Sequence, residues 1–144
     1  MSIMFSRRCE YALQAVLYLA LKNGGTRTSV KELVQHIQVP SPFLAKILQE
    51  LAHKGVLMSS KGPRGGFGLA KPANQITMLE IVESVDGTAF TNGCLLGFME
   101  CTTETPCAMH DEWFGIRDRI IGALGNQDLG EMARRMHKPE YVGA

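Results

Sequence analysis

The clearest architectural signal in this chain lies in residues 39–72, VPSPFLAKILQELAHKGVLMSSKGPRGGFGLAKP. Proline cannot continue a helix, but Pro42 directly after a Ser41 cap is well placed to begin one. Apolar side chains then recur at helical spacing until the chain reaches Lys54 and Gly55: Phe43, Leu44, Ile47, Leu48 and Leu51. This period predicts a helix that buries one face and exposes the other.

Two short strands joined by a glycine-rich basic loop are predicted directly after this helix. Residues 56–58 and 69–72 are the candidate strands, and residues 59–68, SSKGPRGGFG, are the loop between them. Lys61 and Arg64 at its tip have no apolar partner to explain them, so we expect them to contact phosphate or the minor groove of DNA. This arrangement describes a wing.

Two helices are predicted upstream of the wing. Apolar residues follow a helical period over residues 9–22. Ser29 stands three residues before Glu32, a capping box that starts a second helix running to about Ile37. This second helix, a short turn and the helix that follows Pro42 form a helix-turn-helix, whose second helix enters a major groove.

The helical pattern resumes downstream but is interrupted once. Thr77 and Glu80 form a capping box for a helix over residues 78–87, after which periodicity fails until about residue 110. A long helix from Asp111 then carries more apolar surface than one small domain needs to bury. We interpret it as a dimerisation helix. The apolar surface comes from Trp113, Phe114, Ile116, Ile120, Ile121 and Leu124.

A short last helix over residues 129–136, capped by Asn126 or Asp128, completes the pattern. The predicted fold is mainly α, a winged helix-turn-helix with a two-stranded wing and a long C-terminal dimerisation helix. The chain divides into three regions: a DNA-binding region at 1–85, a cysteine-bearing sensor loop at 86–110, and the dimerisation helix with the C-terminal tail at 111–144.

The composition is that of one ordinary globular domain, with 45% hydrophobic and 20% charged residues in 144. A net charge of +1 excludes a histone-like binder but allows a locally basic face. No stretch reaches transmembrane length and no signal peptide is evident, so we expect a cytoplasmic protein with reduced cysteines. The four histidines show no pairing with a nucleophile and an acid, which argues against an enzyme.

Three cysteines lie in the non-periodic segment as Cys94-x6-Cys101-x5-Cys107, with His110 just behind them. Thiolates are the ligands that iron-sulfur clusters require. The spacing lacks the CxxC pairs of a structural zinc site, and the polar, glycine-bearing surroundings do not resemble a core of free thiols. A metal or redox sensor is the favoured hypothesis, with zinc or unconnected thiols as alternatives. Cys9 is either a packing residue or a redox partner.

The motifs VPSPFLAKILQELAHKGVL, SSKGPRGGFGLAKP and ITMLEIVESVDG, together with the three-cysteine loop, resemble the Rrf-two (Rrf2) family of winged-helix transcriptional regulators. The resemblance runs from about Ser6 to about Met136 and favours the iron-sulfur-sensing branch, typified by IscR and NsrR. It implies a homodimer with crossed C-terminal helices, a palindromic double-stranded DNA operator, and an iron-sulfur cluster.

The resemblance also implies which residues bind the cluster. Cys94, Cys101 and Cys107 supply three ligands, and His110 resembles the fourth ligand of the IscR type. In NsrR-like members an acidic residue of the first helix fills this place, and Glu10 of the partner subunit is the matching candidate. A two-iron cluster is favoured, with a four-iron form as the alternative.

The predicted DNA contacts come from the helix-turn-helix and from the wing. The helix after Pro42 exposes Ser41, Lys46, Gln49 and Glu50 opposite its apolar stripe, so these side chains are expected to face the groove. Lys46 matches a base-contacting position of IscR-like proteins. The candidate residues are Ser29, Ser41, Pro42, Phe43, Lys46, Gln49, Lys61, Arg64, Gly65 and Gly66. The predicted function is a homodimeric DNA-binding transcriptional regulator, acting as a repressor, whose operator affinity depends on the cluster. The alternative is a cluster-free regulator controlled by thiol oxidation or by a partner protein.

Overall fold

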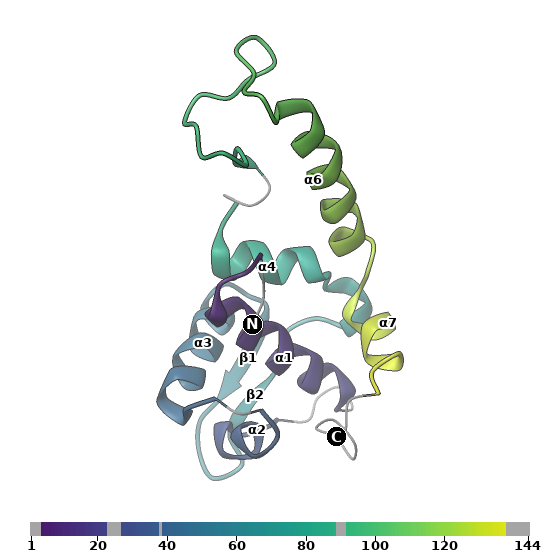
Figure 1. Ribbon diagram of the computed structural model, residues 1–144. Helices are drawn as coiled ribbons and strands as arrows, with labels where there is room; N and C mark the ends of the chain where they lie inside the picture. The colour runs from purple at the N-terminus through teal and green to yellow at the C-terminus, as the bar shows by residue number, and fades with distance from the viewer. Residues whose placement is uncertain (1–3, 23–26, 38, 89–91, 138–144) are drawn as a thin grey trace.

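A computed structural model of the chain describes residues 4–22, 27–37, 39–88 and 92–137. Helix α1, Arg7–Leu21, packs against α4 and α7 and also touches α3 and strand β2 (Figure 1). It begins two residues before the predicted start because the Ser6 hydroxyl caps it, accepting a hydrogen bond from the backbone N–H of Cys9 at 3.1 Å. Its inner face supplies much of the core.

The predicted helix-turn-helix is present as α2, Val30–His36, and α3, Ser41–His53. The Ser29 hydroxyl caps α2 by accepting from the backbone N–H of Glu32, as predicted. The other half of the expected capping box, a contact from the Glu32 carboxylate back to the cap residue, is wrong. The Glu32 carboxylate turns to α1 instead. It accepts a hydrogen bond from the Tyr18 hydroxyl at 3.0 Å and pairs with Lys22 at 2.9 Å.

The start of α3 differs from the prediction by one position. Ser41 is the first residue of the helix, and Pro40 occupies the cap position without a side-chain hydrogen bond. Pro42 therefore stands second, where its missing N–H costs nothing because the first-turn amides have no partner within a helix. The inner face of α3 is buried as predicted at Leu44, Ile47, Leu48 and Leu51.

The wing consists of strands β1, Leu57–Ser60, and β2, Gly66–Leu69, paired antiparallel with Ser60 opposite Gly66. The strands reach further into the glycine-rich segment than predicted, and only residues 61–65 form the loop. The segment before α2 extends this ladder, since Thr28 and Phe67 exchange backbone hydrogen bonds of 2.9 and 2.8 Å. That long-range pairing orders residues that have little strand propensity of their own.

Gly66 is required where the wing meets Thr28. Its φ is +153°, and a Cβ added there would overlap the backbone carbonyl of Thr28. We therefore expect Gly66→Ala to destabilise the protein by about 2–3 kcal/mol in thermal unfolding. Gly115→Ala is the matched control, because the space around Gly115 is open and alanine favours the helix that holds it. An unfolding temperature for Gly66→Ala equal to that of the unaltered protein would contradict this account.

The remaining elements run from η1, Ala73–Gln75, through α4, Met78–Asp86, and α6, His110–Gly125, to α7, Leu129–Arg134. The Thr77 hydroxyl caps α4, as predicted. Asp128 rather than Asn126 caps α7, because its carboxylate accepts from the Glu131 N–H at 2.8 Å while its backbone bridges to Thr77. The cap of α7 is thus tied to the start of α4.

Helix α6 and the segment that precedes it project away from the rest of the protein (Figure 1). Only His110 and Arg117 of α6 are buried, while Ile116 is 48% exposed and the other apolar side chains of the helix are partly exposed. An exposed apolar helix face of this kind is suited to protein association. None of the helices within the described ranges is long and apolar enough to cross a lipid bilayer.

Candidate metal centre and nucleic-acid interface

The three loop cysteines converge in space. The sulfur atoms of Cys94, Cys101 and Cys107 all lie within 4.8 Å of one another, and those of Cys94 and Cys107 are 3.7 Å apart. None of the three is bridged by a disulfide, and each is partly buried. The segment between residues 94 and 107 has no regular secondary structure, so the folded loop rather than a helix or strand brings the sulfurs together.

The surroundings favour a thiolate at one of these positions. Partial burial raises the pKa of the Cys94 thiol, but hydrogen bonds from the backbone amides of Phe98 and Leu96 outweigh it and, with the neighbouring thiols, lower this pKa to about 7. A backbone hydrogen bond at Cys107 lowers the pKa of Cys101, but burial and the adjacent thiols raise it overall. A low-pKa thiol beside two others suits a soft metal or an oxidant.

His110 lies beside the cysteines, at the first turn of α6. Its Nδ1 is 3.1 Å from the sulfur of Cys101, its ring packs on Phe114 with centroids 4.3 Å apart, and only 4% of the residue is exposed. This burial argues against a surface or capping role. Neither His110 nor Glu10, which lies on α1, belongs to the group of ligand atoms that all lie within 4.8 Å of one another in one protomer.

Two residues that the sequence analysis missed hold the backbone next to Cys94. The indole N–H of Trp113 donates to the carbonyl oxygen of Gly93 at 2.9 Å, and Nη1 of Arg117 reaches the same oxygen at 3.4 Å. Both share a face of α6 with His110, at positions three and seven residues further on. That helical spacing was visible in the sequence, but it did not show that the face turns toward the cysteines.

The donor set fits a thiolate-bound metal group. Three sulfurs within mutual reach, one of them easily ionised, match the ligands of an iron-sulfur cluster, and the buried imidazole offers a further nitrogen donor. The chemical character of these side chains supports the fit independently of any relative.

Cys9 belongs to the core and not to this cluster. It is fully buried on α1, and burial, followed by the negative charges of Asp86 and Glu10, raises the pKa of its thiol to about 12. A thiol that remains protonated near neutral pH is a poor nucleophile. Of the two interpretations of Cys9, the structure supports packing.

Helix α3 presents an exposed face to solvent, with Lys46 and Gln49 on it and Ser41, Pro42 and Phe43 at its start. The prediction that Phe43 belongs to the buried stripe is wrong, because the residue is 38% exposed and its side chain contacts Tyr11 edge-on. Glu50, also considered groove-facing, instead pairs with Arg8 and with Lys54, which ties α3 to α1.

The wing tip carries the exposed cations predicted for it. Lys61 and Arg64 are exposed and form no ion pair among the described residues. Gly65 and Gly66 serve the wing itself, since a side chain at either would overlap backbone at Ser60 or Thr28. The predicted role of these two glycines in approaching DNA stays a prediction.

Arg27, which the sequence analysis missed, lies near this surface. Its Nε donates to the hydroxyl of Ser60 on β1 at 2.9 Å, which places a cation beside the wing. Ser29 is exposed at the adjoining cap of α2. The helix-turn-helix and the wing therefore offer basic and polar groups from neighbouring segments.

The family model for Rrf2, described as an iron-dependent transcriptional regulator, matches residues 5–135. The chain belongs to the Rrf2 family. An Aquifex aeolicus protein described as an HTH-type transcriptional regulator is 39% identical over 120 residues, which are 82% of this chain and 83% of that protein. The HTH-type transcriptional regulator IscR of Cronobacter sakazakii is 30% identical over 123 residues, covering 85% of this chain and 75% of IscR. These Rrf2 relatives are transcriptional regulators and not enzymes.

Solved structures share the same fold. CymR (YrzC), the global cysteine regulator of B. subtilis, superposes with a TM-score of 0.79 at 24% identity, covering 94% of this chain and all of CymR. IscR of T. potens superposes with a TM-score of 0.71 at 22% identity, covering 96% of this chain and 95% of that one. The predicted family and the predicted winged-helix fold are confirmed.

Proposed function

We propose that this Rrf2 protein is a homodimeric transcriptional regulator whose operator affinity depends on an iron-sulfur cluster held in the sensor loop. One observation carries the proposal. Three cysteine sulfurs from one loop lie within 4.8 Å of one another, in the same chain as a winged helix.

Cys94, Cys101 and Cys107 are the proposed cluster ligands, and His110 is the favoured fourth one because its imidazole already touches Cys101. Glu10 of the partner subunit is the alternative. When bound, the cluster supplies reactivity toward oxidants or nitric oxide that the protein side chains lack. A histidine or carboxylate ligand would leave one iron more accessible than a thiolate would, and a two-iron cluster is favoured.

The proposed DNA reader is the exposed face of α3 together with the wing. Lys46 and Gln49 would enter the major groove, while Lys61 and Arg64 would contact phosphate or the minor groove. The apolar face of α6 would pack against the same face in a second protomer. The two DNA-binding surfaces of the dimer would then contact the two halves of a palindromic operator.

Polar contacts connect the C-terminus of α4, which precedes the cysteine segment in the chain, to α3 by way of α1. Asp86, the last residue of α4, accepts hydrogen bonds from the backbone N–H of Ser6 at 2.9 Å and from its hydroxyl. In the first turn of α1, which Ser6 caps, Arg8 pairs with Glu50 of α3. A carboxylate at a helix C-terminus opposes the helix dipole, and the N-terminus of α1 offsets that cost. Gly87, with a φ of +76°, ends α4 directly after Asp86.

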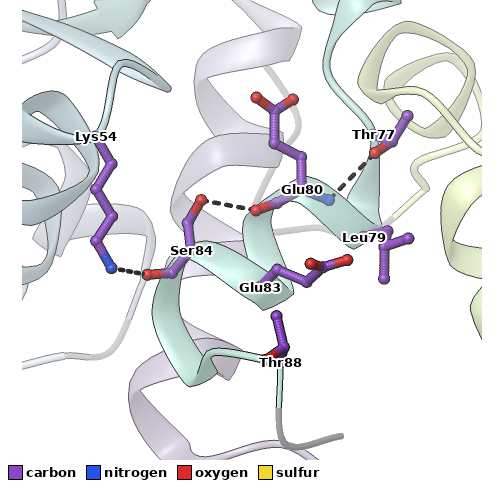
Figure 2. A pocket seen from close by; sticks show the side chains of 7 residues that line it. All are labelled: Lys54, Thr77, Leu79, Glu80, Glu83, Ser84 and Thr88. Carbon is purple, nitrogen blue, oxygen red and sulfur yellow. Dashed lines mark hydrogen bonds between the residues drawn. The ribbon is translucent and has the colours of Figure 1, made fainter. Parts of the chain in front are cut away.

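A second connection joins the end of α3 to α4 and is shown in Figure 2. The Lys54 ammonium group donates to the backbone carbonyl of Ser84, across a groove also lined by Glu83 and Thr88. A shift of α4 would therefore change the position of α3 through the contacts of both Ser84 and Asp86. Differential stability of only a few kcal/mol between two such arrangements is enough to switch operator affinity.

We expect Asp86→Asn to reduce the difference in operator affinity between cluster-loaded and cluster-free protein by about fivefold, because the amide cannot accept both Ser6 hydrogen bonds as a carboxylate does. Fluorescence anisotropy with a labelled operator would measure both affinities. Glu83→Gln, on the same helix, removes an equal charge and should leave the difference unchanged. An unaltered ratio in Asp86→Asn would show that the coupling takes another route.

Thiol oxidation is the second candidate, and the 3.7 Å separation of the Cys94 and Cys107 sulfurs favours it specifically. Two thiols at this distance need only a small movement to form a disulfide. The oxidised form of Staphylococcus aureus CymR has the same fold, with a TM-score of 0.74. In this version the loop would switch operator affinity without any metal.

Anaerobic purification followed by iron analysis, sulfide analysis and a visible spectrum tests the proposal. Brown protein with near-stoichiometric iron and sulfide, and an operator affinity that changes when the cluster is removed, is the expected result. Colourless protein that stays colourless after anaerobic reconstitution would overturn the cluster proposal and favour thiol oxidation. Equal operator affinity in both cluster states would overturn the proposed regulation.

A further inference from the structure

Arg117 is the one arginine or lysine on α6 whose side chain is buried, among the residues that the structure describes. It is 8% exposed, whereas Arg119 on the same helix is exposed. Burying a guanidinium group is expensive unless an anion accompanies it. None of the described carboxylates pairs with Arg117.

The contacts of Arg117 leave part of its hydrogen-bonding capacity unused. Its guanidinium carbon lies 3.9 Å from the centre of the Phe114 ring, and Nη1 reaches the carbonyl oxygen of Gly93 at 3.4 Å. Its Nε is buried without an acceptor. Neither an aromatic face nor a neutral carbonyl carries the full negative charge that a buried cation needs.

A series of contacts along this face of α6 connects Arg117 to the cysteine site. Arg117 packs on Phe114, Phe114 packs on His110, and Nδ1 of His110 lies 3.1 Å from the sulfur of Cys101. The carbonyl that Arg117 contacts belongs to Gly93, the residue directly before Cys94. Three thiols become anionic when they bind a metal, and a fixed cation beside them favours that state.

We propose that Arg117 is a positioning residue of the metal centre. It balances the charge of a thiolate-bound metal group and holds the backbone of Cys94 through Gly93. This role rests on the proposed function, since it assumes that the three cysteines bind a metal. It also explains why α6 buries a cation at this position while its other basic side chain remains in solvent.

Binding of Co²⁺ alone tests this role, because thiolate-to-cobalt charge-transfer absorption reports the three cysteines without any cluster assembly. We expect Arg117→Gln and Arg117→Met to weaken Co²⁺ binding by about ten- to a hundredfold, as loss of an outer contact to metal ligands does. Arg117→Lys keeps the charge and should stay within roughly threefold of the unaltered protein. Arg119→Gln, which removes an exposed arginine from the same helix, is the matched control and should bind normally.

Circular dichroism of the metal-free variants shows which neutral variant is folded, and methionine is included because an apolar side chain tolerates burial better than glutamine. Unchanged Co²⁺ affinity in a folded neutral variant would overturn the proposal. So would an equal loss in Arg117→Lys, because the charge would then not matter. If the unaltered protein assembles no iron-sulfur cluster while Arg117→Gln still weakens Co²⁺ binding, the cluster proposal fails and the role of Arg117 stands.

Discussion

Replacing Cys107 by serine should remove the cluster almost completely, with iron, acid-labile sulfide and visible absorption falling to background. The Cys107 sulfur lies 3.7 Å from that of Cys94 and completes the only group of three metal ligands found among the described residues. A serine hydroxyl is neither ionised near neutral pH nor soft, so it cannot replace a thiolate. Metal and sulfide analysis of anaerobically purified variants would measure the effect.

Cys9→Ala is the matched control for this experiment. Cys9 is buried on α1 and remains protonated, so its loss should leave iron and sulfide unchanged. Retention of normal iron content by Cys107→Ser would show that the cysteine loop does not hold the cluster. Cys107→Ser should also bind operator with an affinity that no longer responds to oxidant or nitric oxide.

The double variant Lys61→Ala/Arg64→Ala should weaken operator binding by about a hundredfold, since each contact is expected to contribute on the order of 1–3 kcal/mol. Both side chains are exposed at the wing tip and form no ion pair in the described part of the chain, so they are available for DNA. Fewer phosphate contacts should also make the dependence of affinity on salt concentration shallower. Anisotropy titrations at several salt concentrations would measure both effects.

Competition with random duplex separates the two modes of contact. If Arg64 reads a base edge or a narrow minor groove, the operator loses its advantage over random DNA, whereas phosphate contact weakens binding to both equally. Arg119→Ala removes an exposed arginine from α6 and should change neither affinity. Operator binding by the double variant at the unaltered affinity would exclude the wing from the interface.

The helix-turn-helix was predictable because its signals are local. The signals are Pro42 at the start of α3, the Ser29 cap of α2 and the 3.6-residue apolar period. Each depends on residues a few positions apart, and the structure contains both helices nearly as predicted. The wing was predicted less accurately. Thr28 pairs with Phe67 of β2 across the fold, and no local pattern reports that pairing.

The site was predictable in kind but not in full. The cysteines and His110 are recognisable from their chemistry and from the family resemblance. The structure brings the three sulfurs together and places His110 beside Cys101. Gly93, Trp113 and Arg117 were missed because a carbonyl, an indole and an arginine carry no metal-ligand signal of their own. Their importance comes from which face of α6 turns toward the loop.

The sequence by itself therefore determined the family, the helices and the three candidate thiol ligands, since residue type and spacing along the chain encode these directly. Only the tertiary structure decided which groups meet. It placed Asp86 on the start of α1, turned Glu50 toward Arg8 instead of the groove, and buried Arg117 behind the cysteines. Such contacts join residues distant in sequence, and they form only when burial of the apolar core fixes how the helices pack.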